Sequence, residues 1–395
     1  MHFDKELNAI KELYRSGKYD SVFYRARITD ESQLESYEGF QSIPFMYKRE
    51  LRNSTVMERT TTEKKDIFGV FSSSGTTGEK TFYVYSKKDK QVHEEFVKTF
   101  YTELEITEDD IGCIMAPVDT GVMAHSMMWQ FTTMGAGYIN CPEPSPENII
   151  DTVTKVPVTV IATRPSIAAC VAYNPLIKER AQRSSVRKLL LGGGFLSDEK
   201  RKLLEEAWDA DVYNMFGMSE MFGPMAGECK NKNGQHYLDR YLMIEVVDPE
   251  TKQPVEDGQI GVAIYTTLWD KGFPLLRYWT DDLIMIRRDT CPCGSTLPRL
   301  HYKGRLNDCF VMNGHYVFPE DVENILIRNG CIGEYRVEKE HDQYRVKVET
   351  MDMTLSPSVI KELEALFHST VIGETVSPGG LNYDGHGKRF FVEES

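Results

Sequence analysis

The feature that most constrains the fold is an alternation of short apolar runs with helical stretches in the middle of the chain. The runs are rich in Val, Ile, Leu and Met, as buried strands are, and they cover residues 111–117, 158–163, 186–191 and 211–216. Between the last two, residues 197–208 form an amphipathic helix pattern that Ser197 can cap. Strand–helix–strand alternation of this kind predicts parallel sheet in an α/β domain.

The remainder of the chain has a different pattern. Residues 243–247 and 261–266 flank tight-turn sequences and predict antiparallel strands, hence a β-rich part. Further on, a helix beginning at Pro319, two strands on either side of His341 and a helix capped by Ser356 predict a small α+β unit. The boundary before this unit is expected at residues 304–308, where polar residues follow a glycine.

Composition limits the classes of partner. A chain of 395 residues with a formal charge of -14 does not suit a nucleic-acid backbone as its main partner. No apolar run approaches the length of a membrane span, and residues 1–7 lack the apolar core of a signal peptide. Eight cysteines without a secretion signal indicate reduced thiols, so we expect a cytoplasmic protein without a membrane partner.

A loop of small polar residues joins two predicted strands, residues 66–71 and 81–85. Seven successive positions are Ser, Gly or Thr, and Lys80 follows closely; the loop includes Ser73, Ser74, Gly75, Thr76, Thr77 and Gly78. Hydroxyls, freely oriented backbone N–H groups and an ammonium suit a polyphosphate. The spacing and the absence of a following helix exclude a Walker-type loop. A mobile polar hairpin loop is the ordinary alternative.

Four later motifs are each weak alone. They are Phe-Gly-Met-Ser-Glu at 216–220, Arg-Tyr-Trp-Thr-Asp-Asp at 277–282, Gly-Arg-Leu-Asn-Asp at 304–308 and Gly-His-Gly-Lys-Arg at 385–389. In a functional interpretation, the first motif supplies an aromatic ring for a base and a carboxylate for a cation, and the second supplies a carboxylate for a ribose. The third would be a hinge, and the fourth would carry a mobile lysine. In the ordinary interpretation, the first motif is a core aromatic with a solvated glutamate and the second is a polar turn. The third is then a connecting loop, and the fourth is a solvated basic tail.

The order of these motifs is specific where each alone is not. From about Ile43 to the end, the chain resembles the adenylate-forming superfamily of acyl-CoA synthetases, adenylation domains and luciferases. Within it, the chain is most similar to the phenylacetate-CoA ligase family. The closest likenesses are residues 73–78, Ser219-Glu220 with Gly223-Pro224, Cys291-Pro292-Cys293-Gly294, and Val317-Phe318-Pro319.

The resemblance implies an α/β fold in two parts. Residues 1–303 would form a large N-terminal adenylation domain of parallel and mixed sheets with helices plus the β-rich part. Residues 304–308 would be the hinge, and residues 309–395 a small, mobile α+β C-terminal domain.

The resemblance also implies a role for individual residues. The loop from Ser73 to Lys80 would wrap the β- and γ-phosphates of ATP, and Glu220 would bind Mg²⁺. Adenine would lie between Gly193, Gly194 and Phe216, beside Gly217 and Ser219. Asp282, helped by Arg305, would hold the ribose. Lys388 would bridge the phosphate and the carboxylate in the first step, so Lys388, Glu220 and Lys80 are the expected catalytic residues.

Three departures from the family pattern stand out. Asp281 occupies a position that is usually Gly, which adds a second carboxylate near the ribose. Asn307 replaces the usual hinge aspartate. In the tail, alignment on Gly-Lys selects Lys388, whereas alignment on the following Arg places His386 at the lysine position; we prefer Lys388 because the chemistry requires a fixed cation.

Two short pairs of metal-ligating residues lie in turns. Cys229 with His236, and Cys291 with Cys293, could make a tetrahedral zinc site of three thiolates and one imidazole. With four protein ligands the zinc would be structural. The alternative is that these are four ordinary side chains without a metal, because Cys-x-Cys is tighter than the usual Cys-x-x-Cys spacing. The resemblance supports zinc, because some members of that family bind it.

We therefore expect ATP-dependent activation of a carboxylic acid as acyl-AMP, then transfer to coenzyme A. The candidate walls of a pocket for an aromatic or apolar acid are residues 121–129, with His125, and also Tyr213 and Phe222. The ordinary alternative is that 121–129 is a core helix and His125 a hydrogen-bonded core residue. One alternative is the same adenylation with an amine, a protein or a cofactor as acceptor. An alternative of another class is a non-catalytic nucleotide-binding regulator. The expected small molecules are ATP, Mg²⁺, coenzyme A and zinc, and a homodimer is allowed for.

Overall fold

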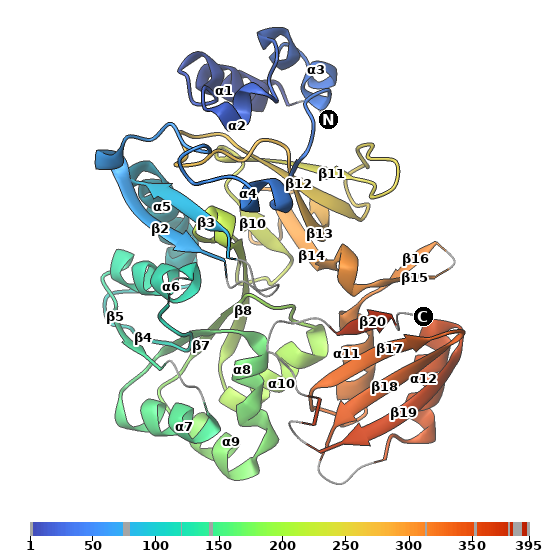
Figure 1. Ribbon diagram of the computed structural model, residues 1–395. Coiled ribbons are helices and arrows are strands. Elements are labelled where there is room, and N and C mark those ends of the chain that lie inside the picture. Colours follow the sequence, from blue (N-terminus) through green and yellow to red (C-terminus); the bar gives the residue numbers. More distant parts are fainter. Residues whose placement is uncertain are drawn as a thin grey trace. The chain divides into compact units, whose positions relative to one another are not determined.

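A computed structural model describes residues 3–73, 80–119, 121–141, 145–312, 314–350, 354–377, 380–381 and 389–392 (Figure 1). The chain divides into two compact units, one of residues 1–142 and 214–302, the other of residues 143–213 and 303–395. None of the helices in the described ranges combines the length and the apolar character that a membrane crossing requires.

The first unit opens with short helices, as the polar helical pattern of the N-terminal residues indicates. They are α1 (Asp4–Arg15), α2 (Val22–Arg25), η1 (Glu31–Leu34), α3 (Tyr37–Gln41) and α4 (Lys48–Arg52). Arg277 connects this N-terminal region to the sheet. It forms a buried ion pair with Glu245 of a later strand, and it also donates a hydrogen bond to the carbonyl oxygen of Ile43 at 2.7 Å. This region is therefore held by the strands that follow it far along the chain.

A strand series forms the β-rich part of the first unit. Its order is β11 (Leu242–Val247), β12 (Gly261–Thr267), β13 (Tyr278–Arg287), β14 (Arg299–Arg305), β10 (Gln235–Tyr237), β9 (Gly223–Glu228) and β8 (Asp211–Met218). The expected antiparallel pair is confirmed as β11 and β12. In addition, β1 (Met46–Tyr47) pairs parallel with β13.

The predicted strands on either side of the Ser/Gly/Thr loop form a hairpin. They are β2 (Ile67–Ser72), which follows η2 (Lys64–Asp66), and β3 (Phe82–Ser86), and they pair antiparallel. Directly after β3, Ser86 caps α5 (Lys87–Glu103), whose Val92, Phe96 and Phe100 are buried as their spacing predicts. The unit also contains β4 (Ile111–Ile114), α6 (Val122–Thr133) and β5 (Gly137–Asn140), with β4 and β5 parallel.

The second unit begins with the alternation on which the α/β prediction rests. Its elements are α7 (Pro146–Lys155), β6 (Val160–Thr163), α8 (Pro165–Ala169), η3 (Cys170–Tyr173), α9 (Pro175–Gln182), β7 (Lys188–Gly192) and α10 (Asp198–Trp208). Strands β6 and β7 are parallel, and Ser197 accepts the backbone N–H of Lys200, as an N-cap does. The mixed α/β class is confirmed.

The C-terminal part of this unit is a sheet with two helices on one face (Figure 1). After η5 (Leu306–Asp308) come β15 (Phe310–Met312), β16 (His315–Val317), α11 (Pro319–Arg328), β17 (Tyr335–Glu340), β18 (Gln343–Glu349), α12 (Pro357–Phe367), β19 (Thr370–Val376) and β20 (Phe390–Val392). The sheet order is β19-β18-β17-β20. The pattern predicted the helices and the β17–β18 hairpin. It did not predict β19 and β20, whose short or mixed sequences lack regular alternation.

Within the second unit, the C-terminal part contacts α10. Lys200 and Glu323 form a buried ion pair between α10 and α11, and the amide oxygen of Asn324 accepts the backbone N–H of Glu199 at 3.0 Å. The two-domain division with a hinge at 304–308 stays a prediction, since these contacts describe one arrangement of the unit.

Candidate active site

Glu220 lies at the centre of a set of converging donors. It belongs to η4 (Ser219–Met221), directly after β8, and is 3% exposed. Its Oε1 accepts hydrogen bonds from the hydroxyls of Tyr83 at 3.0 Å and Tyr278 at 2.9 Å. The Nζ of Lys48 is 3.5 Å from the same oxygen. Residues of β3, β13 and α4 are thereby brought to one carboxylate.

The surroundings of Glu220 keep its carboxyl group ionised. Burial by itself raises the pKa of Glu220, but Lys48, the residue's own backbone N–H, Tyr278 and Tyr83 together outweigh it, and the net shift is downward. Burial and the neighbouring carboxylate raise the pKa of both phenols far above their usual value, so they remain donors. A buried anion with two fixed donors is suited to receive a cation.

Two glycines shape the chain around Glu220. A Cβ on Gly217 would lie 2.2 Å from the carbonyl oxygen of Gly223, at the point where the β8–β9 register shifts. Gly223 has φ of +107°, and a Cβ there would lie 2.0 Å from Ser126 Oγ. Glycine is thus required at position 217 for the close approach of two backbones, and the adenine contact expected of Gly217 stays a prediction.

The two aspartates of β13 have different surroundings. Asp282 is buried, and its backbone N–H donates to Thr280 Oγ1 at 3.0 Å. Asp281 has φ of +63°, and its carboxylate accepts the indole N–H of Trp279 at 2.6 Å. The left-handed backbone explains why glycine suits this position. The extra carboxylate therefore already has an indole partner, and only the role of Asp282 at a ribose stays as predicted.

The base of the Ser/Gly/Thr loop is closed by hydrogen bonds. The backbone N–H of Ser73 donates to the carbonyl of Thr81 at 2.9 Å, and Ser73 Oγ accepts the N–H of Thr81 at 3.2 Å. Lys80 is exposed. The other predicted phosphate-binding residues, Ser74, Gly75, Thr76, Thr77 and Gly78, lie outside the described residues. At the described ends of this segment, Ser72 of β2 pairs with Phe82 of β3, in the hairpin that carries Tyr83.

The predicted adenine residues are in different parts of the fold. Gly193 and Gly194 follow β7 and are exposed, and the φ of +72° at Gly193 suits glycine. Phe216 is half-buried, and its ring lies 5.2 Å from that of Tyr302, tilted by 37°. Ser219, at the start of η4, is half-buried.

The C-terminal tail is anchored beside its predicted lysine. Arg389 is buried, pairs with Glu334 and lies over the ring of Tyr335. Asp308 Oδ1 accepts the backbone N–H groups of Arg389 and Phe390, each at 2.9 Å. Lys388 and His386 lie outside the described residues, so the choice between them stays a prediction. Arg305, the predicted ribose partner, is exposed, as is Asn307 at the predicted hinge.

A buried layer beneath Tyr83 was missed by the sequence interpretation. Asp89 accepts the indole N–H of Trp269 at 2.7 Å and the backbone N–H of Gly272 at 2.9 Å. The Nζ of Lys271, in the loop so held, is 3.9 Å from the centroid of the Phe273 ring, on which Tyr83 stacks. Burial lowers the pKa of Lys271 to about 8, against the opposing effects of Asp89 and Glu220. Only the aromatic richness of 269–279 hinted at this layer.

An aromatic cluster surrounds Phe222, two residues after Glu220. The centroid of its ring lies 4.8–5.6 Å from those of its neighbours, which are Phe68, Phe71, Tyr85 and His93. His125, on α6, adds a ring 5.1 Å from Phe71. The structure therefore brings together two of the predicted wall residues, Phe222 and His125, through Phe71. Tyr213 belongs to the other unit.

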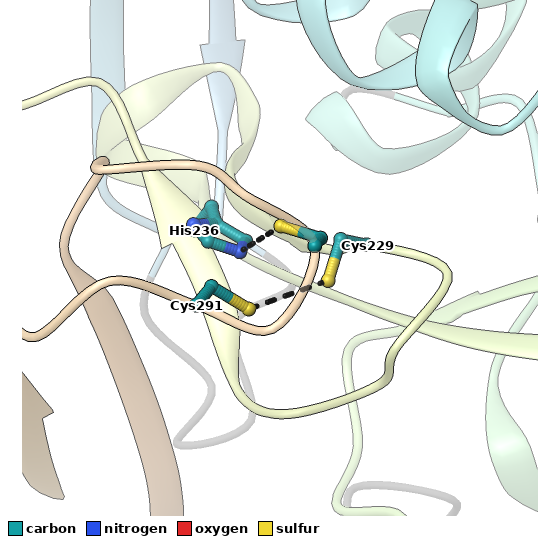
Figure 2. A group of neighbouring side chains, drawn as sticks. Cys229, His236 and Cys291 are labelled. Atoms are coloured by element: carbon teal, nitrogen blue, oxygen red, sulfur yellow. Dashed lines mark hydrogen bonds between the residues drawn. The ribbon is translucent and has the colours of Figure 1, made fainter.

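The four predicted zinc ligands lie together in the first unit (Figure 2). Their ligand atoms are all within 4.8 Å of one another in Cys229, His236, Cys291 and Cys293. The Sγ atoms of Cys229 and Cys291 are 3.9 Å apart, and Cys293 Sγ is 3.6 Å from His236 Nε2. Ligand atoms on a tetrahedral zinc lie roughly 3.3–3.8 Å apart. His236 Nδ1 is 3.1 Å from the carbonyl of Leu297, which would orient Nε2 toward a metal.

The chain is similar in sequence and in structure to proteins that are named as coenzyme A ligases. Phenylacetate-coenzyme A ligase of Thermus thermophilus is 28% identical over 330 residues, which are 78% of this chain and 72% of that protein. The Escherichia coli protein of the same name is 23% identical over 330 residues, 80% and 74% of the two chains. The crystal structure of a 2-hydroxyisobutyryl-CoA ligase in its postadenylation state superposes with a TM-score of 0.81 at 20% identity, covering 98% and 89%.

The last comparison confirms the α/β fold. The resemblance that the order of motifs indicated is confirmed as well, because the model of the AMP-binding enzyme family matches residues 4–266. This match spans more than half of the chain, and we conclude that the chain belongs to the AMP-binding enzyme family.

Proposed function

We propose that this enzyme activates a carboxylic acid with ATP, forming acyl-AMP and pyrophosphate, and then transfers the acyl group to coenzyme A. The observation that carries the proposal is the convergence on Glu220. Tyr83 ties it to the hairpin that bears the Ser/Gly/Thr loop, and Tyr278 ties it to the strand that bears Asp282. Glu220 is thereby hydrogen-bonded to two strands that adjoin motifs distant from it in the sequence.

The first step must bring two anions together, because a carboxylate has to attack the α-phosphorus of a triphosphate. The backbone and hydroxyls of the loop from Ser73 would hold the outer phosphates, and Lys80 would accompany the leaving pyrophosphate. Glu220 would hold Mg²⁺, which offsets the charge of the phosphates when bound. Asp282 and Arg305 would fix the ribose, and Lys388 would lie between the two reacting anions. Catalysis would therefore be positioning and electrostatics.

The acid is proposed to be aromatic or apolar. The cluster around Phe222 begins two residues after Glu220, and it consists of aromatic rings packed against one another. A ring or alkyl group placed among them would leave water, which favours binding by roughly 25 cal/mol per Å² of apolar surface. The names of the curated relatives support an aryl acid, although the ligase of similar fold carries a small hydroxy acid in its name.

The acyl group of the adenylate must be transferred to an acceptor in the second step. Coenzyme A is favoured because the relatives are named for it. In the second step the C-terminal domain, residues 309–395, would turn about residues 304–308 near Asn307 and withdraw Lys388. An amine, a protein or a cofactor remains the alternative acceptor, and a second copy of the chain remains a proposed partner that sedimentation would detect.

The Cys229, His236, Cys291 and Cys293 cluster is proposed to hold a structural zinc. Two observations support this: the four ligand atoms converge, and the carbonyl of Leu297 faces the opposite nitrogen of the imidazole. Protein side chains would occupy all four coordination positions of the zinc, so the ion would have no open position for catalysis.

Pyrophosphate release tests the function directly. A set of carboxylic acids, each with ATP and magnesium, would be assayed with and without coenzyme A, and at least one acid should give release. Lys388→Ala should then lose release while still binding ATP, and His386→Ala is its matched neighbour. Release by no acid would favour a nucleotide-binding regulator. If pyrophosphate release is unchanged in Lys388→Ala but lost in His386→Ala, the role proposed for Lys388 belongs to His386.

A further inference from the structure

The three donors at Glu220 are held to different degrees. The two phenols are buried, and their hydrogen bonds of 3.0 and 2.9 Å have ordinary length. The Lys48 side chain is 39% exposed, and its 3.5 Å separation is that of an ion pair without a good hydrogen bond. Two contacts are therefore fixed, and the third can be given up to water.

The backbone of Lys48 is fixed although its side chain is not. Lys48 is the first residue of α4 and directly follows β1, in which Met46 pairs with Tyr278 of β13. Glu50 of the same helix caps the chain by accepting the N–H of Tyr47 at 2.7 Å and also pairs with Arg27. The backbone of Lys48 is thus held next to β1, which pairs with the strand that carries Tyr278, and a flexible side chain brings the ammonium to Glu220.

We propose that Lys48 is an exchangeable counter-ion of Glu220, which neutralises this carboxylate before nucleotide binds and leaves it when the magnesium–nucleotide complex arrives. Tyr83 and Tyr278 are positioning residues that keep Oε1 in place during the exchange. This inference rests on the proposed function, since it takes Glu220 as the ligand of the magnesium.

The energetic reason is the burial of Glu220. A buried carboxylate without a cation is costly, so the site needs a positive charge at every stage. An ion pair with one exposed partner contributes little and is easily broken. Lys48 can return its ammonium to water while its stem stays along the protein. Both phenol hydrogen bonds go to Oε1, so the incoming cation would approach the carboxylate at Oε2.

Removing Lys48 and removing a phenol should have opposite effects on magnesium. ATP binding would be measured calorimetrically in the complete protein over a series of magnesium concentrations, starting from excess EDTA. In Lys48→Met the magnesium concentration for half-maximal tightening should fall about two- to fivefold, because a competing cation is gone. In Tyr83→Phe and Tyr278→Phe it should rise about tenfold, because the carboxylate loses a charged hydrogen bond.

Matched variants separate these effects from folding. Tyr19→Phe removes a buried hydroxyl with no hydrogen-bond partner among the described residues, and Lys11→Met removes a lysine paired with Glu35 at 2.8 Å. Both should leave the magnesium requirement unchanged. Thermal unfolding gives a second readout: ATP with magnesium should raise the melting temperature of Lys48→Met by more than that of the wild type.

Two results would overturn the exchange. The first is a Lys48→Met protein that needs as much magnesium as the wild type. The second is one whose ATP affinity drops equally with and without magnesium, which would make Lys48 a phosphate ligand. Acid-dependent pyrophosphate release by the wild type establishes the proposed function separately. With that release present, either result contradicts only the role of Lys48.

Discussion

The indole Nε1 of Trp279 donates a 2.6 Å hydrogen bond to the carboxylate of Asp281, next to the aspartate predicted to hold the ribose. Asp281 is in the left-handed region, with φ of +63°. The two neighbouring carboxylates of β13 therefore have separate tasks, one in the protein and one proposed for the nucleotide.

This separation predicts a contrast between two isosteric variants. Asp282→Asn should raise the KM for ATP about tenfold or more, because a charged acceptor of ribose hydroxyls becomes a neutral one. Asp281→Asn should change it less than about threefold, since an amide oxygen still accepts the indole N–H and asparagine tolerates positive φ. Steady-state kinetics at saturating acid measures both. Equal losses would show that both carboxylates hold the nucleotide.

Gly217 offers a test of how the backbone positions Glu220. Gly217→Ala should lower the free energy of unfolding by about 2–4 kcal/mol, because its Cβ would lie 2.2 Å from the carbonyl oxygen of Gly223. Gly137→Ala is the matched control in another strand, where a Cβ would meet Ile111 Cγ1 at 3.8 Å and the carbonyl oxygen of Asp110 at 4.0 Å, both ordinary contact distances. Urea unfolding compares them. Similar stability of the two variants would contradict the close backbone approach.

His93 predicts part of the acid sensitivity of the fold. Burial lowers the pKa of His93 to about 4, whereas in the unfolded chain it is about 6.5. Between these values the unfolded state binds more protons, so stability falls as the pH falls. From pH 7 to 5 the loss should be about 2 kcal/mol. Urea unfolding at both pH values should show a smaller loss in His93→Met than in the wild type.

The exposed His341, in the β17–β18 turn, provides the control for that experiment. His341→Asn should keep the pH dependence of the wild type. If His93→Met and the wild type lose stability equally on acidification, His93 is not the group responsible.

The cysteine–histidine cluster predicts a metal that copurifies with the protein. Elemental analysis should find stoichiometric zinc in the wild type and in Cys170→Ser, whose cysteine lies outside the cluster, and much less in Cys291→Ser. A strong chelator should lower the melting temperature of the wild type, because folding and metal binding are coupled. A metal-free wild-type protein with the same melting temperature would reject the site.

Much of the fold could be predicted because local signals agreed with it. Ser197 caps α10, Ser86 caps α5, and the β11–β12 and β17–β18 pairs follow from alternation around turns. The cysteine–histidine cluster could also be anticipated, because short chelating pairs in turns restrict where their side chains can go. Strands β19 and β20 could not, since each is stabilised by pairing with a partner already in the sheet.

The residues around Glu220 could not be predicted for a different reason. Tyr83 and Tyr278 lie in strands rich in aromatic residues, where a tyrosine ordinarily belongs to the core. Lys48 is one of many charged residues in the N-terminal region. Only the three-dimensional pairing of β1 with β13, and the position of η4 after β8, brings their polar atoms to one oxygen. The pattern of residues along the sequence does not reveal that these side chains converge.

Detection of the acyl-AMP intermediate is the sharpest test of carboxylic acid activation by this protein. The protein would be mixed with ATP, magnesium and an active acid without coenzyme A, quenched after a single turnover, and analysed by mass spectrometry. An acyl-adenylate should accumulate, and it should be converted into acyl-CoA when coenzyme A is added. Tight binding of ATP with no adenylate from any acid would contradict the proposed activation.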